Sequence, residues 1–142
     1  METNRRNRYL IPLLLLLVLG GAWLTLGNRR QLPAFKSQGQ TRIGSHQAEL
    51  RIWDFSAVDG DSVRIYFDKE LIFDSLFITD VPVVYHTGPL RSGIHRLGVE
   101  AISEGMTAPA TPHISVNDGQ QTVEFDVNAK LDSAASWQIV VP

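Results

Sequence analysis

Cysteine is absent from the 142 residues of this chain. Its absence excludes disulfide bonds, thiolate nucleophiles, a lipid-modified cysteine and zinc sites built on thiolates. A folded domain in this chain therefore depends on its apolar core, and 44% of the residues are apolar. Catalytic signatures are also lacking: no serine stands in a G-x-S-x-G context, and no His-rich or paired-Glu pattern accompanies the serines. We expect the protein not to be an enzyme.

Acidic residues are nearly missing from the first third of the chain and abundant in the rest. Residues 1–47 hold seven Lys or Arg against one acid, a net charge of +6, whereas residues 48–142 hold six against fourteen, a net charge of −8. Phosphate backbones and anionic lipid headgroups repel an acidic domain. We therefore expect no nucleic-acid binding, and favour cations or soluble proteins as partners.

An uncharged, mostly apolar run at residues 9–26 follows a basic tail at residues 1–8. This layout is typical of a signal peptide or a retained signal anchor. As a helix, the run spans about 27 Å, close to the roughly 30 Å hydrocarbon core of a bilayer. Gly20-Gly21-Ala22 offers small residues for cleavage, but Trp23-Leu24-Thr25-Leu26 continues the apolar run. We favour a membrane anchor over a cleaved signal.

The basic tail also bears on the compartment. A short basic tail before an N-terminal apolar helix is the usual export layout, so we predict that the N-terminus stays inside. The rest of the chain is then expected in the periplasm or outside the cell of a bacterium, as a single-pass membrane protein, or secreted if the signal is cleaved. Residues 27–47 lack acids and show no apolar period. They predict a flexible, basic stalk.

From residue 48 onward, apolar and polar residues alternate, and no segment of useful length has a helical period. The pattern predicts eight strands separated by turn sequences. They lie near residues 50–52, 63–67, 71–78, 81–85, 94–102, 113–116, 123–127 and 136–141. Short strands at a spacing of about ten residues are typical of an antiparallel, Ig-like β-sandwich. The expected fold is all-β, with seven or eight strands over residues 48–142 after one N-terminal helix.

Several motifs of this region carry a resemblance to a known kind of domain. In chain order they are Trp53-Asp54, Asp59-Gly60-Asp61-Ser62-Val63, Gly93-Ile94-His95, Leu97, Val99, Ala101, Glu104-Gly105 and Pro109-Ala110-Thr111. The order resembles a small Ig-like β-sandwich domain of uncharacterised function in bacterial secreted and envelope proteins. The resemblance implies a fold and a compartment but no reaction. Its pattern has Asn where this chain has His95, Ser103 and Ala110, so no role of those amides carries over.

Three carboxylates lie close together in the sequence, at Asp54, Asp59 and Asp61. If they converge at one end of the sandwich, they offer the oxygen ligands that Ca²⁺ prefers. The Asp59-Gly60-Asp61 loop is therefore a candidate calcium site, although its spacing departs from the EF-hand pattern. In the alternative interpretation, Asp59 and Gly60 form a tight turn, and Asp54 and Asp61 cap nearby backbone N–H groups.

Aromatic residues suggest a second kind of ligand. Rings can stack on the apolar faces of sugars, and Trp53 and Tyr66 are the candidates for such a platform. Tyr66 is out of phase with Ile65 and Phe67, so we expect it to be exposed. Ordinary packing is the alternative for both rings. His95 is in phase with the apolar residues that follow it, and we expect a structural histidine there.

The sequence thus predicts a non-enzymatic binding or structural module of the bacterial cell envelope. Its N-terminal segment would bind the membrane, and an envelope protein or a glycan is the expected partner. The alternative is a calcium- or carbohydrate-binding domain that uses the Asp59-Gly60-Asp61 loop.

Overall fold

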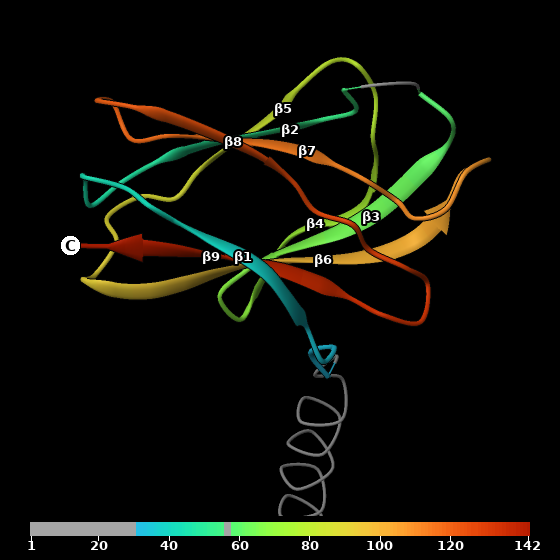
Figure 1. Cartoon of the computed structure of the whole chain (residues 1–142), viewed down its shortest axis with the longest axis horizontal. Coiled ribbons are helices and arrows are strands. Elements are labelled where there is room, and N and C mark those ends of the chain that lie inside the picture. Colours follow the sequence, from blue (N-terminus) through green and yellow to red (C-terminus); the bar gives the residue numbers. More distant parts are fainter. Residues whose placement is uncertain (1–30, 56–57) are drawn as a thin grey trace, which may run out of the picture. The chain divides into compact units, whose positions relative to one another are not determined.

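The computed structural model describes residues 31–55 and 58–142, and these ranges contain strands but no helix. The nine strands are β1 (Lys36–Arg42), β2 (Glu49–Trp53), β3 (Asp61–Phe67), β4 (Glu70–Phe77), β5 (Val83–His86), β6 (Gly93–Glu104), β7 (His113–Asn117), β8 (Thr122–Asp126) and β9 (Ala135–Val141). They form a five-stranded sheet, in the order β1-β9-β6-β3-β4, and a four-stranded sheet, in the order β5-β2-β7-β8. The two sheets form two layers (Figure 1). The all-β prediction is confirmed, and the layers are consistent with a β-sandwich.

The eight predicted strands are all present, and β1 is the additional one. It lies within the predicted flexible stalk, residues 27–47, and that prediction is wrong for residues 36–42. β1 pairs with β9 in parallel, so the prediction of a purely antiparallel fold is wrong for this pair. The sequence does not predict β1, because the strand lies at a sheet edge and carries polar residues on both faces. Its large apolar neighbours are Phe35 and Ile43, just outside its two ends.

Side chains on both sides of β1 attach it to the rest of the domain. Gln38 Nε2 donates to the carbonyl of Asn128 at 2.6 Å, and the Asn128 N–H donates to Gln38 Oε1 at 2.8 Å. The Phe35 ring lies 5.4 Å from the Tyr66 ring, centroid to centroid. It also covers Gly98, where a Cβ atom would come within 2.6 Å of the Phe35 ring. A side chain at position 98 would therefore displace the Phe35 ring.

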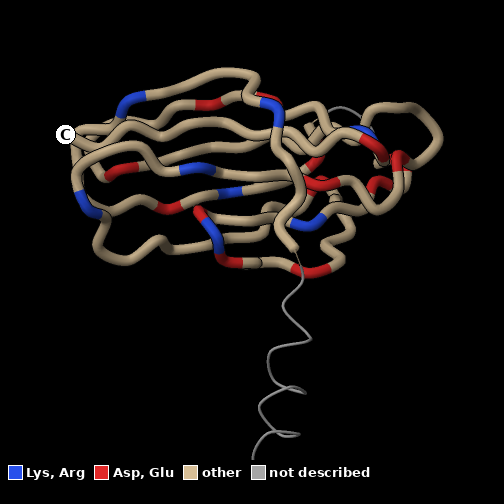
Figure 2. Tube along the Cα trace, turned by 90° about the horizontal axis from the view of Figure 1, so that it is seen from below, with Lys and Arg blue, Asp and Glu red and all other residues tan. Residues whose placement is uncertain are grey.

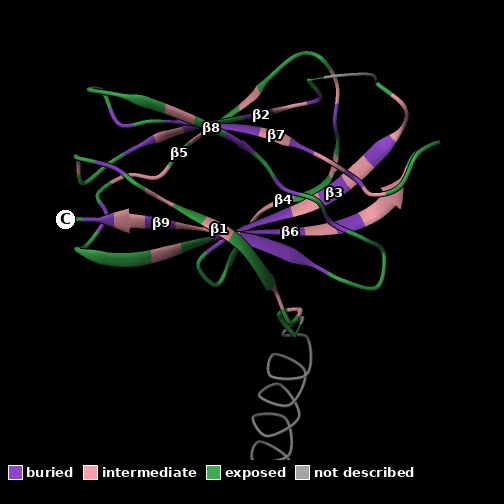
Figure 3. Ribbon diagram, in the orientation of Figure 1, coloured by how far each residue is buried: buried purple, intermediate pink, exposed green. Residues whose placement is uncertain are grey.

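The apolar core lies between the two sheets. Residues that the alternation places on the inner faces are fully buried, among them Leu50, Ile52, Val63, Ile65, Leu97, Val99, Ile114 and Val116. Figure 3 shows buried positions in strands of both layers. Trp137 of β9 stacks on Phe125 of β8, with ring centroids 4.3 Å apart, and so joins the sheets along one edge.

This core belongs to a compact unit, Pro33–Pro142. Because the unit contains both sheets and its own buried core, we treat it as an independently folding domain. The predicted basic tail, residues 1–8, and the predicted membrane segment, residues 9–26, lie outside the described residues. Among residues 31–55 and 58–142, no helix has the length and apolar character needed to cross a membrane.

Candidate functional site

The three predicted carboxylates converge at one end of the domain. Asp54 follows β2 in the four-stranded sheet, Asp61 begins β3 in the five-stranded sheet, and Asp59 lies just before Asp61. One oxygen from each carboxylate lies within 4.8 Å of the others. Figure 2 shows acidic residues gathered at the end of the domain opposite the C-terminus. Gly60 has a φ of +106°, a conformation that side chains disfavour, and it allows the turn that brings Asp59 beside Asp61.

One oxygen of Asp59 and one of Asp61 cap backbone N–H groups. Asp59 Oδ2 accepts from the Thr107 N–H at 3.1 Å, and Asp61 Oδ2 accepts from the Thr111 N–H at 3.0 Å. Asp61 therefore caps a backbone N–H group as predicted, although that group lies in the distant β6–β7 loop and not nearby, and Asp59, predicted only for the turn, caps a second group there. The backbone N–H of Asp54 donates to the carbonyl of Thr79 at 2.7 Å, which attaches a third loop.

The other oxygens of two carboxylates have no donor. Asp59 Oδ1 and Asp61 Oδ1 are buried and accept no hydrogen bond from the residues that the structure describes. Asp61 is only 5% exposed. Burial raises the pKa of Asp61, the hydrogen bond from Thr111 opposes that rise, and the charges of Asp59 and Asp54 add to it, so that the net shift is upward. A proton or a cation shared between these oxygens would relieve the repulsion.

The spacing of the carboxylates suits calcium. Because Ca²⁺ holds its oxygen ligands at roughly 2.3–2.6 Å, two ligands of one ion lie at most about 5 Å apart. The carboxylate oxygens of the three aspartates meet this condition, because one from each residue lies within 4.8 Å of the others. They line a cavity of about 370 Å³ together with Met106, Thr107, Ala108, Pro109 and Thr111. That volume leaves room for the water ligands that complete a coordination shell of six to eight oxygens.

The two aromatic candidates do not form a common platform. Tyr66 is only 2% exposed, so the prediction that it faces solvent is wrong. The Phe35 ring covers it, and its hydroxyl donates to Glu100 Oε2 at 2.8 Å. Trp53 belongs to the other sheet and packs against His113, with ring centroids 4.6 Å apart. The two rings therefore lie on different sheets and cannot hold one sugar together.

Two histidines contact carboxylates that are distant in sequence. His113 Nδ1 lies 2.6 Å from Asp126 Oδ1, and Phe55 stacks on the His113 ring at a centroid distance of 4.9 Å. His95 Nδ1 lies 2.8 Å from Asp68 Oδ2. Burial lowers the pKa of His95, but hydrogen bonds to the Arg91 carbonyl and to Asp68 outweigh it and raise the pKa overall. The structural role predicted for His95 agrees with these contacts.

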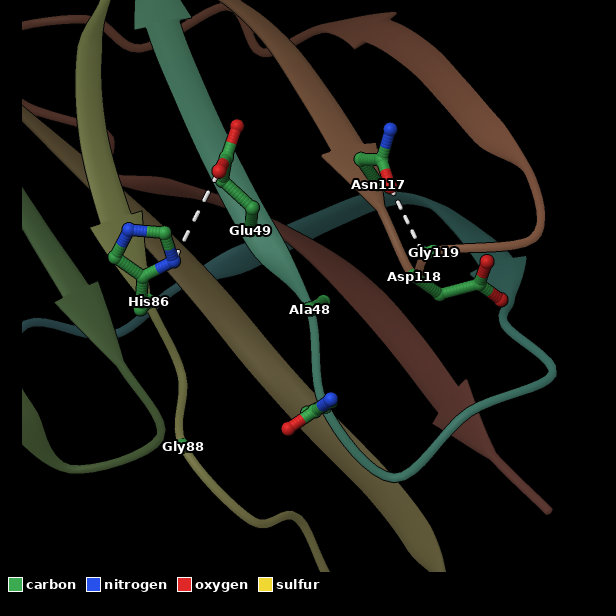
Figure 4. Close-up of a pocket in the computed structure, with 8 residues that line it drawn as sticks. Ala48, Glu49, His86, Gly88, Asn117, Asp118 and Gly119 are labelled. Carbon is green, nitrogen blue, oxygen red and sulfur yellow. Dashed lines mark hydrogen bonds and ion pairs between the residues drawn. The ribbon is translucent and has the colours of Figure 1, made fainter.

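A second pocket lies at the opposite end, where β2, β5 and β7 meet the loops (Figure 4). His86 Nδ1 lies 3.9 Å from Glu49 Oε2 across this pocket. Asp118 points away from both residues in Figure 4. Its Oδ2 accepts from the Gly44 N–H at 2.6 Å, and its Oδ1 accepts from the N–H groups of Gln120 and Gln121 at 2.9 and 2.8 Å. Asp118 therefore holds two loops together by backbone contacts.

Replacing Asp118 is expected to destabilise the domain. In Asp118→Asn, an amide NH₂ would face the Gly44 N–H, so one charge-assisted hydrogen bond is lost and two donors oppose each other. We expect a loss of about 2 kcal/mol in the free energy of unfolding, measured by urea titration at pH 7. Asp132→Asn is the matched control, because Asp132 is exposed. Equal stability of the two variants would contradict a structural role for Asp118.

The loss of stability in Asp118→Asn is expected to become smaller at acidic pH. Burial raises the pKa of Asp118, but the hydrogen bonds from the backbone N–H groups of Gly44, Gln120 and Gln121 outweigh burial and lower the pKa below the ordinary 3.8. The contribution of Asp118 is therefore present above pH 3.8 and is lost as the pH falls through the lowered pKa. The difference between the wild-type protein and Asp118→Asn should narrow over that acidic range.

Comparison with known proteins adds no relative. No family model, no curated protein and no solved structure matches this chain. The resemblance to bacterial envelope domains therefore stays a prediction.

Proposed function

We propose that residues 33–142 form a calcium-binding module, of Ig-like type and without enzyme activity, that acts in the bacterial envelope outside the cytoplasm. The observation that carries the proposal is the pair of buried, donor-free oxygens, Asp59 Oδ1 and Asp61 Oδ1, within the carboxylate cluster. Buried acceptors are rarely left unpaired in folded proteins, and a cation satisfies both at once. Asp54 supplies the third carboxylate.

A bound ion would also stabilise the arrangement of the two sheets and of the β6–β7 loop. Asp54 comes from the end of a strand in one sheet, and Asp61 from the start of a strand in the other. An ion held by both therefore links the two sheets at this end of the domain. Through Thr107 and Thr111, the same carboxylates hold the β6–β7 loop, so its position would depend on the ion as well.

The proposed compartment and the proposed ligand are compatible. The basic tail and the apolar run at residues 9–26 support export and membrane anchoring. Extracellular calcium modules bind the ion with dissociation constants of roughly 10⁻⁴–10⁻³ M, a range that three carboxylates with water ligands can reach. Glycan binding through Trp53 and Tyr66 receives no support, because Tyr66 is buried.

Thermal melting of residues 33–142 with calcium and with a chelator tests the proposal. If the dissociation constant is near 10⁻⁴ M, 10 mM Ca²⁺ contributes about 2.7 kcal/mol to the stability of the folded state. For a domain of this size we expect the melting midpoint to rise by roughly 10 °C. Magnesium at the same concentration is the control for a nonspecific ionic effect. A midpoint that calcium leaves unchanged would remove the proposed function.

A further inference from the structure

Four large apolar side chains protrude into solvent at the carboxylate end of the domain. Phe55 is 75% exposed, Val58 50%, Val81 68% and Met106 86%. We call these four residues the apolar collar. They come from the β2–β3, β4–β5 and β6–β7 connections, which lie on the right of Figure 1. Apolar side chains brought to one end by three separate loops are typical of a surface that contacts a partner.

Three of the four collar residues lie next to the carboxylate cluster in the sequence or in its cavity. Phe55 directly follows Asp54 in the chain, and Val58 directly precedes Asp59. Met106 lines the carboxylate cavity itself.

Val81 belongs to the β4–β5 loop, which is hydrogen-bonded to Asp54. Its N–H donates to Thr79 Oγ1 at 3.2 Å, and the Thr79 carbonyl accepts the Asp54 N–H at 2.7 Å. Thr79 therefore contacts both Val81 of the collar and Asp54 of the carboxylate cluster.

We propose that the calcium-bound collar inserts into the surface of an anionic phospholipid bilayer. The proposal rests on the calcium-binding function proposed above. Without an ion, the three carboxylates repel headgroup phosphates and oppose insertion. A bound Ca²⁺ removes most of this local charge, and its remaining coordination positions accept phosphate oxygens from the headgroups. The surrounding apolar side chains then enter the acyl boundary, as the apolar residues of interfacial segments do.

Both the charge and the chain layout favour a bilayer over a protein partner. Exposed apolar side chains beside a charged site match a surface that is ionic at its headgroups and apolar just beneath them. The predicted membrane segment at residues 9–26 would also keep the domain near a bilayer, which raises the effective concentration of the collar at its surface. A weak, calcium-dependent second contact is then sufficient to orient the domain.

Cosedimentation of residues 33–142 with vesicles tests this inference. The vesicles contain phosphatidylglycerol and phosphatidylcholine in one series and phosphatidylcholine alone in the other, each with calcium or with chelator. We expect binding only to the phosphatidylglycerol vesicles and only with calcium. In the double variant Phe55→Ser and Val81→Ser, vesicle affinity should fall about a hundredfold, because each of the two buried apolar side chains is worth roughly a factor of ten. The calcium-induced rise in melting midpoint should be retained.

Ile94→Ser is the matched control, because Ile94 is 66% exposed at the other end of β6. We expect this variant to bind vesicles as the wild-type domain does. Calcium stabilisation without vesicle binding, or an equal loss of affinity in the control and the double variant, would overturn the membrane inference and leave calcium binding standing. If calcium causes neither stabilisation nor vesicle binding, the calcium function fails and this inference fails with it.

Discussion

A fragment that begins at Gly44 is expected to lose the cooperative unfolding that residues 33–142 retain. The shorter fragment lacks β1 (Lys36–Arg42) and with it the hydrogen-bonded ladder to β9. It also lacks Ile43, which is 1% exposed, and the Phe35 ring that covers Tyr66. Fully burying an Ile side chain contributes about 1.5–3 kcal/mol, and the partly buried Phe35 contributes less. Together with the lost backbone hydrogen bonds, this lowers the free energy of unfolding of the shorter fragment by roughly 5 kcal/mol. That loss is comparable to the whole stability of a small domain.

Urea unfolding followed by tryptophan fluorescence measures this deficit. Trp137 reports on the affected edge, because β9 carries it beside β1. Phe35→Ala in residues 33–142 is expected to give an intermediate loss, since it removes one contact and leaves the strand in place. Lys36→Ala, at an exposed position of β1, is the control and should be neutral. Unfolding of the two fragments at the same urea concentration would show that β1 does not belong to the folded unit.

The strand patterns explain why the sequence predicts eight strands and not the ninth. In β2 and β3 one face meets the core and the other meets polar surroundings, so Leu50, Ile52, Val63 and Ile65 alternate with polar or partly exposed residues. Such alternation is readable without a structure. β1 lies at an edge and contributes polar side chains to both faces, so it leaves no alternation to read. β1 is held by a tertiary interaction, its parallel pairing with β9, which lies nearly one hundred residues later in the chain.

The candidate site also has one part that the sequence predicts and one part that it does not. The turn that separates β2 from β3 brings Asp54, Asp59 and Asp61 to one end, and their short spacing in the sequence made this convergence predictable. The N–H groups that bind Asp59 and Asp61 come from the β6–β7 loop, about fifty residues away, and no local pattern indicates them. Tyr66 was misplaced for a similar reason. Its position on β3 is outward as predicted, but a distant ring, Phe35, covers it.

Asp61→Asn is expected to stabilise the domain without calcium and to abolish its stabilisation by calcium. Because the pKa of Asp61 is raised above the ordinary 3.8, the charged form is disfavoured in the folded state. The fold therefore loses stability as the pH rises from 3.8 through the raised pKa, and it remains less stable at neutral pH. The asparagine oxygen can still accept from the Thr111 N–H, and its NH₂ group can donate toward Asp59. We expect a gain of about 1 kcal/mol at pH 7 in chelator.

The two effects of this substitution have opposite signs, and that opposition separates an ion site from simple capping. If no ion binds, the relieved repulsion and the altered hydrogen bond act equally in both conditions, so Asp61→Asn shifts the melting midpoint by the same amount with calcium and with chelator. If the carboxylates hold Ca²⁺, the variant melts above the wild-type domain in chelator and below it in calcium, because one of three anionic ligands is gone. The deciding observation is whether the variant and the wild-type domain exchange the order of their melting midpoints between chelator and calcium. Asp132→Asn, which alters an exposed carboxylate outside the site, should follow the wild-type domain in both conditions.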